Sequence, residues 1–182
     1  GGPAYAAVGK TRLTTPEEKA QQWDLVTGNL QMLGREAGER GVTICLEPLN
    51  RYETDMINIA DQAVDLVERV GSRSVKVHLD TYHMNIEEKS IPDAIRRTGE
   101  HLGHFHACAN DRGIVGTDHI EWPGVRDALA EVGYDGPVVI ESFTPGVKEI
   151  ARACSIWRPL APSQDAIASE GLQFLRALFA QA

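Results

Sequence analysis

Four short apolar runs constrain the fold of this chain more than any other feature, because each ends on a residue that can bind a metal ion. The runs end at Glu47, Asp80, His106 and Glu141, and successive ends are about 26–35 residues apart, close to the length of one strand–helix–strand unit. The carboxyl ends of parallel strands lie on the same side of a sheet or barrel. We therefore expect the four side chains to converge on one site.

Helical signals fill the intervals between these runs. The first helix has the clearest start signals, because Thr15 and Glu18 are placed to form a capping box and Pro16 occupies the first helical position. Its expected buried face is Trp23, Val26, Leu30 and Leu33, and that of the last helix is Ile167, Leu172, Leu175 and Leu178. In chain order, we expect strands over 42–46, 75–79, 103–107 and 137–140, and helices over 16–41, 59–70, 90–99 and 123–132 and from 163 onward.

This alternation predicts an α/β fold with a parallel sheet covered by helices. No glycine-rich phosphate loop follows any of the strands, which argues against a dinucleotide-binding fold. Functional residues at strand carboxyl ends favour a (β/α)8 TIM barrel, which usually needs about 250 residues. Residues 1–182 are therefore expected to form a single domain that is about half of such a barrel. The chain begins Gly1-Gly2-Pro3, without Met and in what reads as a loop, and we expect it to be cut from something longer.

The composition narrows the class of partner. The formal net charge of -8 disfavours nucleic acid, since phosphate binding requires a basic surface, but it is compatible with a neutral small molecule. Three cysteines without a CxxC pair fit a reduced, cytoplasmic setting. No apolar run approaches the length that spans a membrane.

The residues at the four strand ends suggest a particular chemistry. Two glutamates, an aspartate and one histidine suit Mn²⁺, Mg²⁺ or Co²⁺ better than structural zinc, which prefers Cys and His. Four protein ligands leave room for two sugar oxygens, so the ion would polarise a carbonyl and make the neighbouring proton removable. With Glu47 and Glu141 on opposite faces, one removes the proton and the other returns it, which gives epimerisation.

Further polar residues follow the same strand ends, where loops reach a substrate. They are Asn50, Arg51 and Glu53, then Tyr82 and His83, then Asn110, Asp111 and Arg112. His78 and His104 precede two of the strand ends by two residues, and we interpret them as core or as support for the ligands. Cys108 is interpreted as small filler. Taken singly, a strand-end carboxylate is more often a helix cap or an ion-pair partner, but four at matched positions are a much rarer coincidence.

Five motifs resemble the ketose 3-epimerase family, which includes the D-tagatose and D-psicose 3-epimerases of the xylose-isomerase-like TIM barrels. The motifs are EPLNRYE, VKVHLDTYHMNIEE, GHFHACANDR, VVIESF and SIWRPL, and the resemblance runs from about residue 42 to 160. It implies that the chain holds strands five to eight, the C-terminal half, and lacks the N-terminal strands. The chain departs from the family at residues 107–111, where members often carry Gly-Glu, and at Ser142, where Pro is usual.

The same resemblance implies roles for individual residues. Glu47, Asp80, His106 and Glu141 would bind one divalent ion, Mn²⁺ with Mg²⁺ or Co²⁺ as alternatives, and Glu47 and Glu141 would act as the catalytic acid/base pair. Glu53, His83 and Arg112 would bind the O1 and O2 end of the ketose. The full-length protein is expected to be a homo-oligomer, either dimer or tetramer.

The leading hypothesis is thus a sugar epimerase that inverts C3 of a free ketose through a metal-bound enediolate. Aldose–ketose isomerases, hydroxypyruvate-type isomerases and keto-inositol dehydratases are alternatives on the same scaffold. A different class remains open, a non-catalytic truncated metal-binding fragment, because half a barrel would expose two unpaired strand edges and an apolar inner face.

Overall fold

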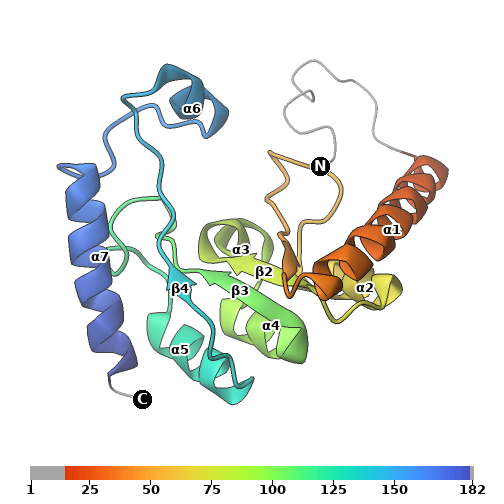
Figure 1. The fold of residues 1–182 in the computed structure, drawn as a ribbon. Helices are drawn as coiled ribbons and strands as arrows, with labels where there is room; N and C mark the ends of the chain where they lie inside the picture. The colour runs from red at the N-terminus through yellow and green to blue at the C-terminus, as the bar shows by residue number, and fades with distance from the viewer. Residues whose placement is uncertain (1–14, 181–182) are drawn as a thin grey trace.

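The computed structural model describes residues 15–180 as a parallel α/β unit. Its four strands are adjacent in chain order, and every neighbouring pair is parallel (Figure 1). The strands are β1 (Ile44–Leu46), β2 (Val75–Asp80), β3 (Leu102–His106) and β4 (Val138–Val139). This arrangement confirms the expected repetition of strand and helix. Residues 1–3, predicted to form a loop, lie outside the described range.

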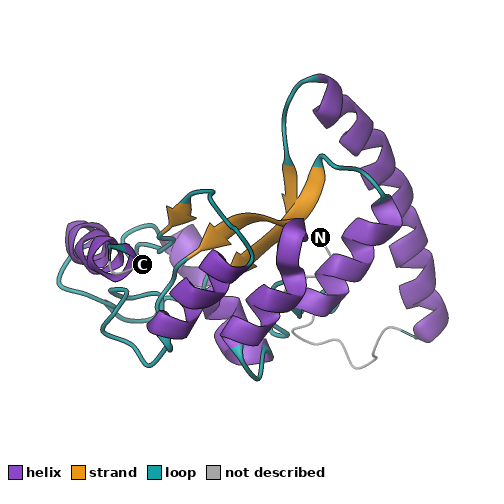
Figure 2. Ribbon diagram, turned by 90° about the horizontal axis from the view of Figure 1, so that it is seen from below, coloured by secondary structure: helices purple, strands orange, loops and turns teal. Residues whose placement is uncertain are grey.

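Seven α-helices accompany the sheet over residues 15–180. They are α1 (Pro16–Glu39), α2 (Ala60–Val70), α3 (Thr81–Glu87), α4 (Ile91–Thr98), α5 (Trp122–Glu131), α6 (Lys148–Ala153) and α7 (Gln164–Phe179). Helices α2, α4 and α5 lie side by side along one side of the sheet (Figure 2). The short helices α3 and α6 have only seven and six residues, too few for a recurring pattern of apolar positions, and the sequence did not predict them. No helix within the described range is long and apolar enough to cross a membrane.

The helix boundaries follow the expected capping residues. Thr15 and Glu18 form the predicted capping box of α1, with the Thr15 backbone N–H donating to Oε2 of Glu18 at 2.9 Å. Ser90 and Ser163 accept backbone N–H groups at the starts of α4 and α7. Gly71 ends α2 in the left-handed conformation that glycine adopts without strain. Two expected core positions are wrong, because Leu33 is 48% exposed and Leu172 is 45% exposed.

Alternating side chains give the sheet two different faces. Val75, Val77 and Leu79 of β2 and Phe105 of β3 are almost fully buried and belong to the apolar core. The intervening residues of β2 and β3 therefore point to the opposite, inner face. There the histidine rings of His78, His104 and His106 lie together. The inner face near the strand ends is thus polar, which corrects the expectation of an apolar inner face.

The register between β2 and β3 contains one irregularity. Val77 is paired with Leu102, but the next residue, His78, is paired with His104, so Gly103 is the extra residue of a bulge. A side chain at Gly103 would not fit, since a Cβ atom there would lie 2.5 Å from the Cβ of Lys76. After the bulge, Asp80 is paired with His106.

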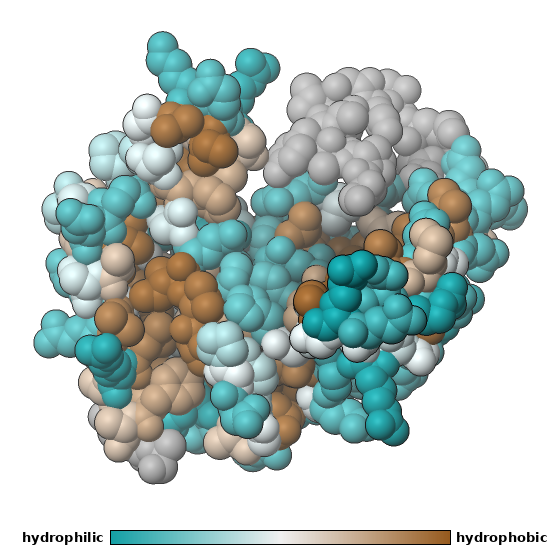
Figure 3. Space-filling model, in the orientation of Figure 1, coloured by the Kyte–Doolittle hydropathy of each residue, from teal (hydrophilic) through white to brown (hydrophobic). Residues whose placement is uncertain are grey.

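Both outer strands lack a further strand partner among residues 15–180. Apolar surface gathers on the side of the molecule where β4 and α7 lie (Figure 3). A groove of about 380 Å³ is found there, with a lining that includes Val138, Ile140 and Leu172. An unpaired strand edge beside apolar surface is a place where another segment can pack.

Candidate functional site

The sheet brings the predicted residues to one edge. Glu47 directly follows β1, Asp80 and His106 are the last residues of β2 and β3, and Glu141 lies two residues beyond β4. Since all four strands are parallel, their carboxyl ends meet, as the spacing of the sequence predicts. Asp80 and His106 are direct neighbours in the register.

Asp80 is the buried centre of the cluster. Its Oδ1 accepts a hydrogen bond from the backbone N–H of Tyr82 at 2.8 Å, which caps α3. Its Oδ2 accepts from Nη1 of Arg112 at 2.6 Å and from Sγ of Cys108 at 3.4 Å. Burial raises the pKa of Asp80, but contacts with His106 and Arg112 outweigh this effect and hold its pKa below the ordinary value. Asp80 is therefore a carboxylate at neutral pH.

His106 stands between two carboxylates. Its Nδ1 lies 3.4 Å from Oδ2 of Asp80 and 3.7 Å from Oε2 of Glu141, yet it is buried without a well-formed hydrogen bond to any described residue. Burial lowers the pKa of His106, but the two carboxylates outweigh it and raise the pKa to about 9. The proximity of His106 in turn lowers the pKa of Glu141, against the effect of burial.

Glu47 has a different environment from Glu141. Its Oε1 is buried, has no hydrogen-bond partner among residues 15–180 and lies 3.8 Å from Nε2 of His83. Its Oε2 lies 3.7 Å from Nδ1 of His78. Burial and the negative charges of Asp80 and Glu141 raise the pKa of Glu47 to about 7. The two glutamates therefore differ in protonation near neutral pH.

Two of the three groups of converging metal-binding atoms among the described residues contain the predicted ligands. Asp80, His106, Cys108 and Glu141 have ligand atoms within 4.8 Å of one another, and so do Glu47, Asp80 and His83. All four predicted ligands belong to these groups, which share Asp80. Oxygen-rich donors with one or two imidazoles suit a divalent ion.

The three predicted substrate-binding residues lie in the same place. Glu53, His83 and Arg112 line a cavity of about 130 Å³, together with both Glu47 and Glu141. The other lining residues are Leu49, Tyr82, Phe143 and Cys154. The cavity thus brings three carboxylates, an imidazole and a guanidinium together with an apolar wall.

His83 is held in one orientation by the loop after β1. The backbone N–H of Asn50 donates to Nδ1 of His83 at 3.1 Å, and Nη2 of Arg112 lies 3.2 Å from Nε2, so both nitrogens of the neutral ring face N–H groups. Burial is the main cause that lowers the pKa of His83 and favours this neutral form. Asn50 also donates through Nδ2 to Oε1 of Glu53 at 3.0 Å, so one buried amide orients two lining residues.

Arg112 is the cation of the site. Besides Asp80, its Nη1 lies 3.0 Å from Oε2 of Glu141, and its Cζ lies 4.1 Å from the ring centre of Tyr82. Its backbone is left-handed, with φ of 66°, and the hydroxyl of Ser142 donates to its carbonyl oxygen at 2.8 Å. Ser142, one of the departures from the family pattern, therefore helps to hold the loop that carries Arg112.

Sequence reasoning missed two supporting residues. Thr81 is fully buried, and its hydroxyl accepts from the backbone N–H of Cys108 at 2.7 Å and donates to the Cys108 carbonyl at 2.6 Å. Cys108 was expected to be filler, but its thiol lies against Asp80. A hydroxyl directly after a strand-end ligand was the available signal for Thr81, whereas the path of the loop after β3 could not be read from the sequence.

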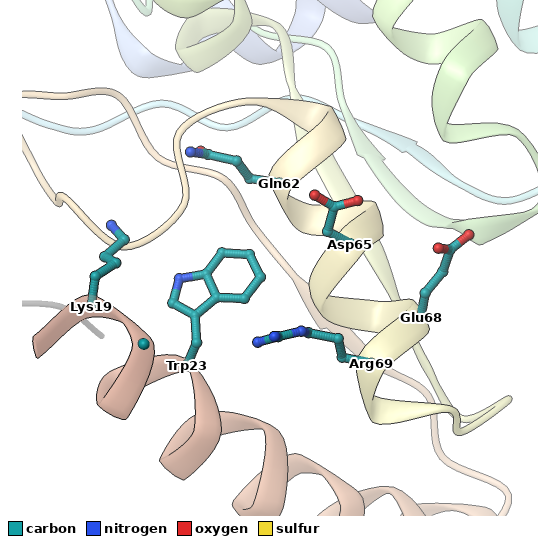
Figure 4. Close-up of a pocket in the computed structure, with 7 residues that line it drawn as sticks. Lys19, Trp23, Gln62, Asp65, Glu68 and Arg69 are labelled. Carbon is teal, nitrogen blue, oxygen red and sulfur yellow. The ribbon is translucent and has the colours of Figure 1, made fainter. Parts of the chain in front are cut away.

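Another groove lies elsewhere, between α1 and α2, and has a volume of about 800 Å³ (Figure 4). Trp23 and Arg69 face each other in it, with Cζ of Arg69 5.5 Å from the ring centre. Asp65 and Glu68 of α2 also line it, but it shares no residue with the strand-end site.

Parallel strands followed by helices, with carboxylates and histidine at their carboxyl ends, define a TIM-barrel type of α/β protein with a strand-end site. The family profile described as xylose isomerase-like TIM barrel matches residues 3–178. The chain belongs to this family. Within residues 15–180 the structure contains four of the barrel-type strand and helix repeats.

Several known proteins are similar to the chain. A D-psicose 3-epimerase of Ruminiclostridium cellulolyticum is 39% identical over 148 residues, covering 81% of this chain and 50% of that protein. A probable ketose 3-epimerase of Synechocystis sp. is 42% identical over 131 residues, covering 72% and 46%. The crystal structure of D-psicose 3-epimerase with D-tagatose from Clostridium cellulolyticum has a TM-score of 0.85 at 35% identity, covering 94% of this chain and 60% of that one. The chain spans about half the length of the curated relatives it matches.

Proposed function

We propose that the chain carries the metal and acid/base centre of an epimerase that inverts C3 of a free ketose. The observation that carries the proposal is the placement of Glu47 and Glu141 at the two outer strands of the sheet, lining one cavity, with Asp80 and His106 between them. The similarity to D-psicose and ketose 3-epimerases supports the substrate class. Among the described residues, Arg112 is the one Lys or Arg that lines the cavity, and it is paired with Asp80 and Glu141, which favours a neutral sugar over a phosphorylated one.

The donor set fits a divalent metal ion. Oε1 of Glu47 and Nδ1 of His106 are buried atoms without hydrogen-bond partners among the described residues. Buried polar atoms usually have a partner, and a bound ion would supply one. We assign Glu47, Asp80, His106 and Glu141 as the residues that would hold the ion, with Mn²⁺ as the expected metal. When bound, such an ion supplies Lewis-acid polarisation of a sugar carbonyl.

The two glutamates supply the proton transfers. A pKa of about 7 lets Glu47 carry a proton near neutral pH, whereas the lowered pKa of Glu141 keeps that residue ionised. One carboxylate therefore removes a proton from C3 while the other donates one to the opposite face. Inversion requires that the sugar carbon lies between them, as their positions on opposite strands allow.

The remaining lining residues orient the sugar. His83 and the guanidinium of Arg112 would bind the carbonyl and hydroxyl oxygens near C1 and C2, and Glu53 would accept a hydroxyl hydrogen bond. Asn50 fixes both Glu53 and His83 before a ligand arrives. Such pre-orientation lowers the entropic cost of reaching the reactive geometry.

The test is isotope exchange in D₂O. We expect the full chain with Mn²⁺ to place deuterium at C3 of D-fructose, D-tagatose or L-ribulose and to form the C3 epimer, both detected by NMR. The control is the double variant Glu47→Gln/Glu141→Gln, which should do neither. Label at C1 or C2 but not at C3 would indicate an isomerase, and a rising enone absorbance from a keto-inositol would indicate a dehydratase. No exchange at any carbon would refute a complete catalytic centre in this chain.

A further inference from the structure

A third group of metal-binding side chains lies next to the carboxylate site. His78, His104 and His106 all project from β2 and β3 onto the inner face of the sheet, and their ligand nitrogens lie within 4.8 Å of one another. The ring centres of His78 and His106 are 4.0 Å apart, and that of His104 is 4.9 Å from His78 and 5.0 Å from His106. The register explains the cluster, since His78 is paired with His104 and Asp80 with His106.

His78 has the features of a ligand rather than of a satisfied core residue. It is only 9% exposed, and its Nε2 is buried with no hydrogen-bond partner among residues 15–180. Buried polar atoms in native structures are nearly always partnered. Its other nitrogen, Nδ1, lies 3.7 Å from Oε2 of Glu47. A carboxylate beside the second nitrogen is the usual way in which metal-binding histidines are oriented.

We propose that His78, His104 and His106 form a second metal site, which takes Zn²⁺ in preference to Mn²⁺. Three imidazole nitrogens without a carboxylate suit Zn²⁺, Cu²⁺ and Ni²⁺, whereas Mn²⁺ prefers oxygen donors. Zinc–nitrogen bonds of about 2.0–2.1 Å place tetrahedral donors about 3.4 Å apart. The three nitrogens are at most 4.8 Å apart, so side-chain rotation has to shorten each separation by no more than about 1.4 Å to reach this distance.

The two sites share one residue, and this sharing has a functional consequence. His106 belongs to the histidine group and also to the group with Asp80 and Glu141. Zinc bound to the three histidines withdraws His106 from the neighbouring carboxylates. Zinc therefore competes with Mn²⁺ for the chain instead of adding to it, and the histidine site is inhibitory.

The experiment compares zinc and manganese affinity on the full chain. Zn²⁺ binding is measured by competition with a fluorescent chelator, and Mn²⁺ binding by the EPR signal of the free ion, for wild type, His104→Gln and the control His101→Gln. The control also removes one imidazole, but His101 lies outside the cluster and contacts Glu68. We expect His104→Gln to lose at least about tenfold in Zn²⁺ affinity and to keep the Mn²⁺ affinity of wild type, which also reports that it is folded.

Equal zinc affinity in wild type and His104→Gln would overturn the proposal, because zinc would then sit among the carboxylates. An equal loss of Zn²⁺ and Mn²⁺ affinity would also overturn it, by showing that His104 only maintains the structure. A second measurement does not depend on the variant. Co²⁺ bound to wild type should give the intense visible absorption of a four-coordinate, nitrogen-rich site, and weak six-coordinate bands alone would contradict the proposal. None of these readouts requires catalysis, so their failure is distinguishable from a failure of the proposed epimerase function.

Discussion

The raised pKa of Glu47 predicts that this residue destabilises the metal-free protein. A carboxyl whose pKa rises from 4.5 to about 7 on folding is easier to protonate in the folded than in the unfolded chain. The folded state thus loses stability as the pH rises from about 4.5 to 7, and the full cost is present above pH 7. Replacement by glutamine keeps the shape of the side chain and removes the charge.

The magnitude follows from the two pKa values. A rise from 4.5 to about 7 corresponds to about 3 kcal/mol at about 1.36 kcal/mol per pH unit. The Glu47 side chain is 28% exposed, so solvent screens part of this cost. We expect Glu47→Gln to increase the free energy of unfolding by about 1–3 kcal/mol at pH 8.5 and by less than about 1 kcal/mol at pH 5.

The assay is urea unfolding of the chelator-treated chain at the two pH values, followed by circular dichroism. Glu170→Gln, in an exposed position of α7, is the matched control and should change stability little at either pH. A loss of stability in Glu47→Gln at pH 8.5 would refute the reasoning. An equal gain at both pH values would refute it too, because a titrating carboxylate cannot give a pH-independent effect.

Three further predictions follow from the site. The single variants Glu47→Gln and Glu141→Gln each keep one base, which can remove and return a proton on one face only. Each should therefore exchange the C3 proton of only one epimer in D₂O, without inversion. Full epimerisation by either variant, detected by NMR, would exclude the two-base scheme. Mn²⁺ must displace protons from Glu47 and His106, whose pKa values are about 7 and about 9. The Mn²⁺ affinity measured by EPR should therefore rise about tenfold per pH unit between pH 7 and 8.5. A Mn²⁺ affinity that does not change with pH would contradict this. Thr81→Val leaves the buried Cys108 N–H without a partner and should lower the free energy of unfolding in urea by about 1–3 kcal/mol. Thr81→Ser keeps the hydroxyl and should change it by less than about 1 kcal/mol. Equal losses of stability in both variants would show that the hydroxyl is not the cause.

The order of elements could be predicted because it depends on local signals. Gly71 and the capping residues Thr15, Ser90 and Ser163 fix helix ends through the backbone groups beside them, and the structure follows all four. The exposure of Leu33 depends on what packs against α1, and periodicity alone carries no such information.

The site was predictable to a similar degree. The convergence of Glu47, Asp80, His106 and Glu141 on one edge follows from parallel strands of equal spacing. The contact between Cys108 and Asp80 was not predictable, because it depends on how the loop after β3 folds back over β2.

The bulge at Gly103 decides which side chains of β3 lie beside the strand-end carboxylates. With regular pairing after Val77 and Leu102, Asp80 would lie beside Phe105 instead of His106. Phe105 would then project among the carboxylates, and His104 and His106 would turn towards the helices. Regular pairing that includes Gly103 would change no ligand residue and would remove both histidines from the inner face, whereas deletion of Gly103 would leave His78 paired with His104 and Asp80 with His106. The bulge therefore determines which alternate residues of β3 face the inner side of the sheet. Gly103 has no side chain, yet it matters for the site as much as the residues that bind.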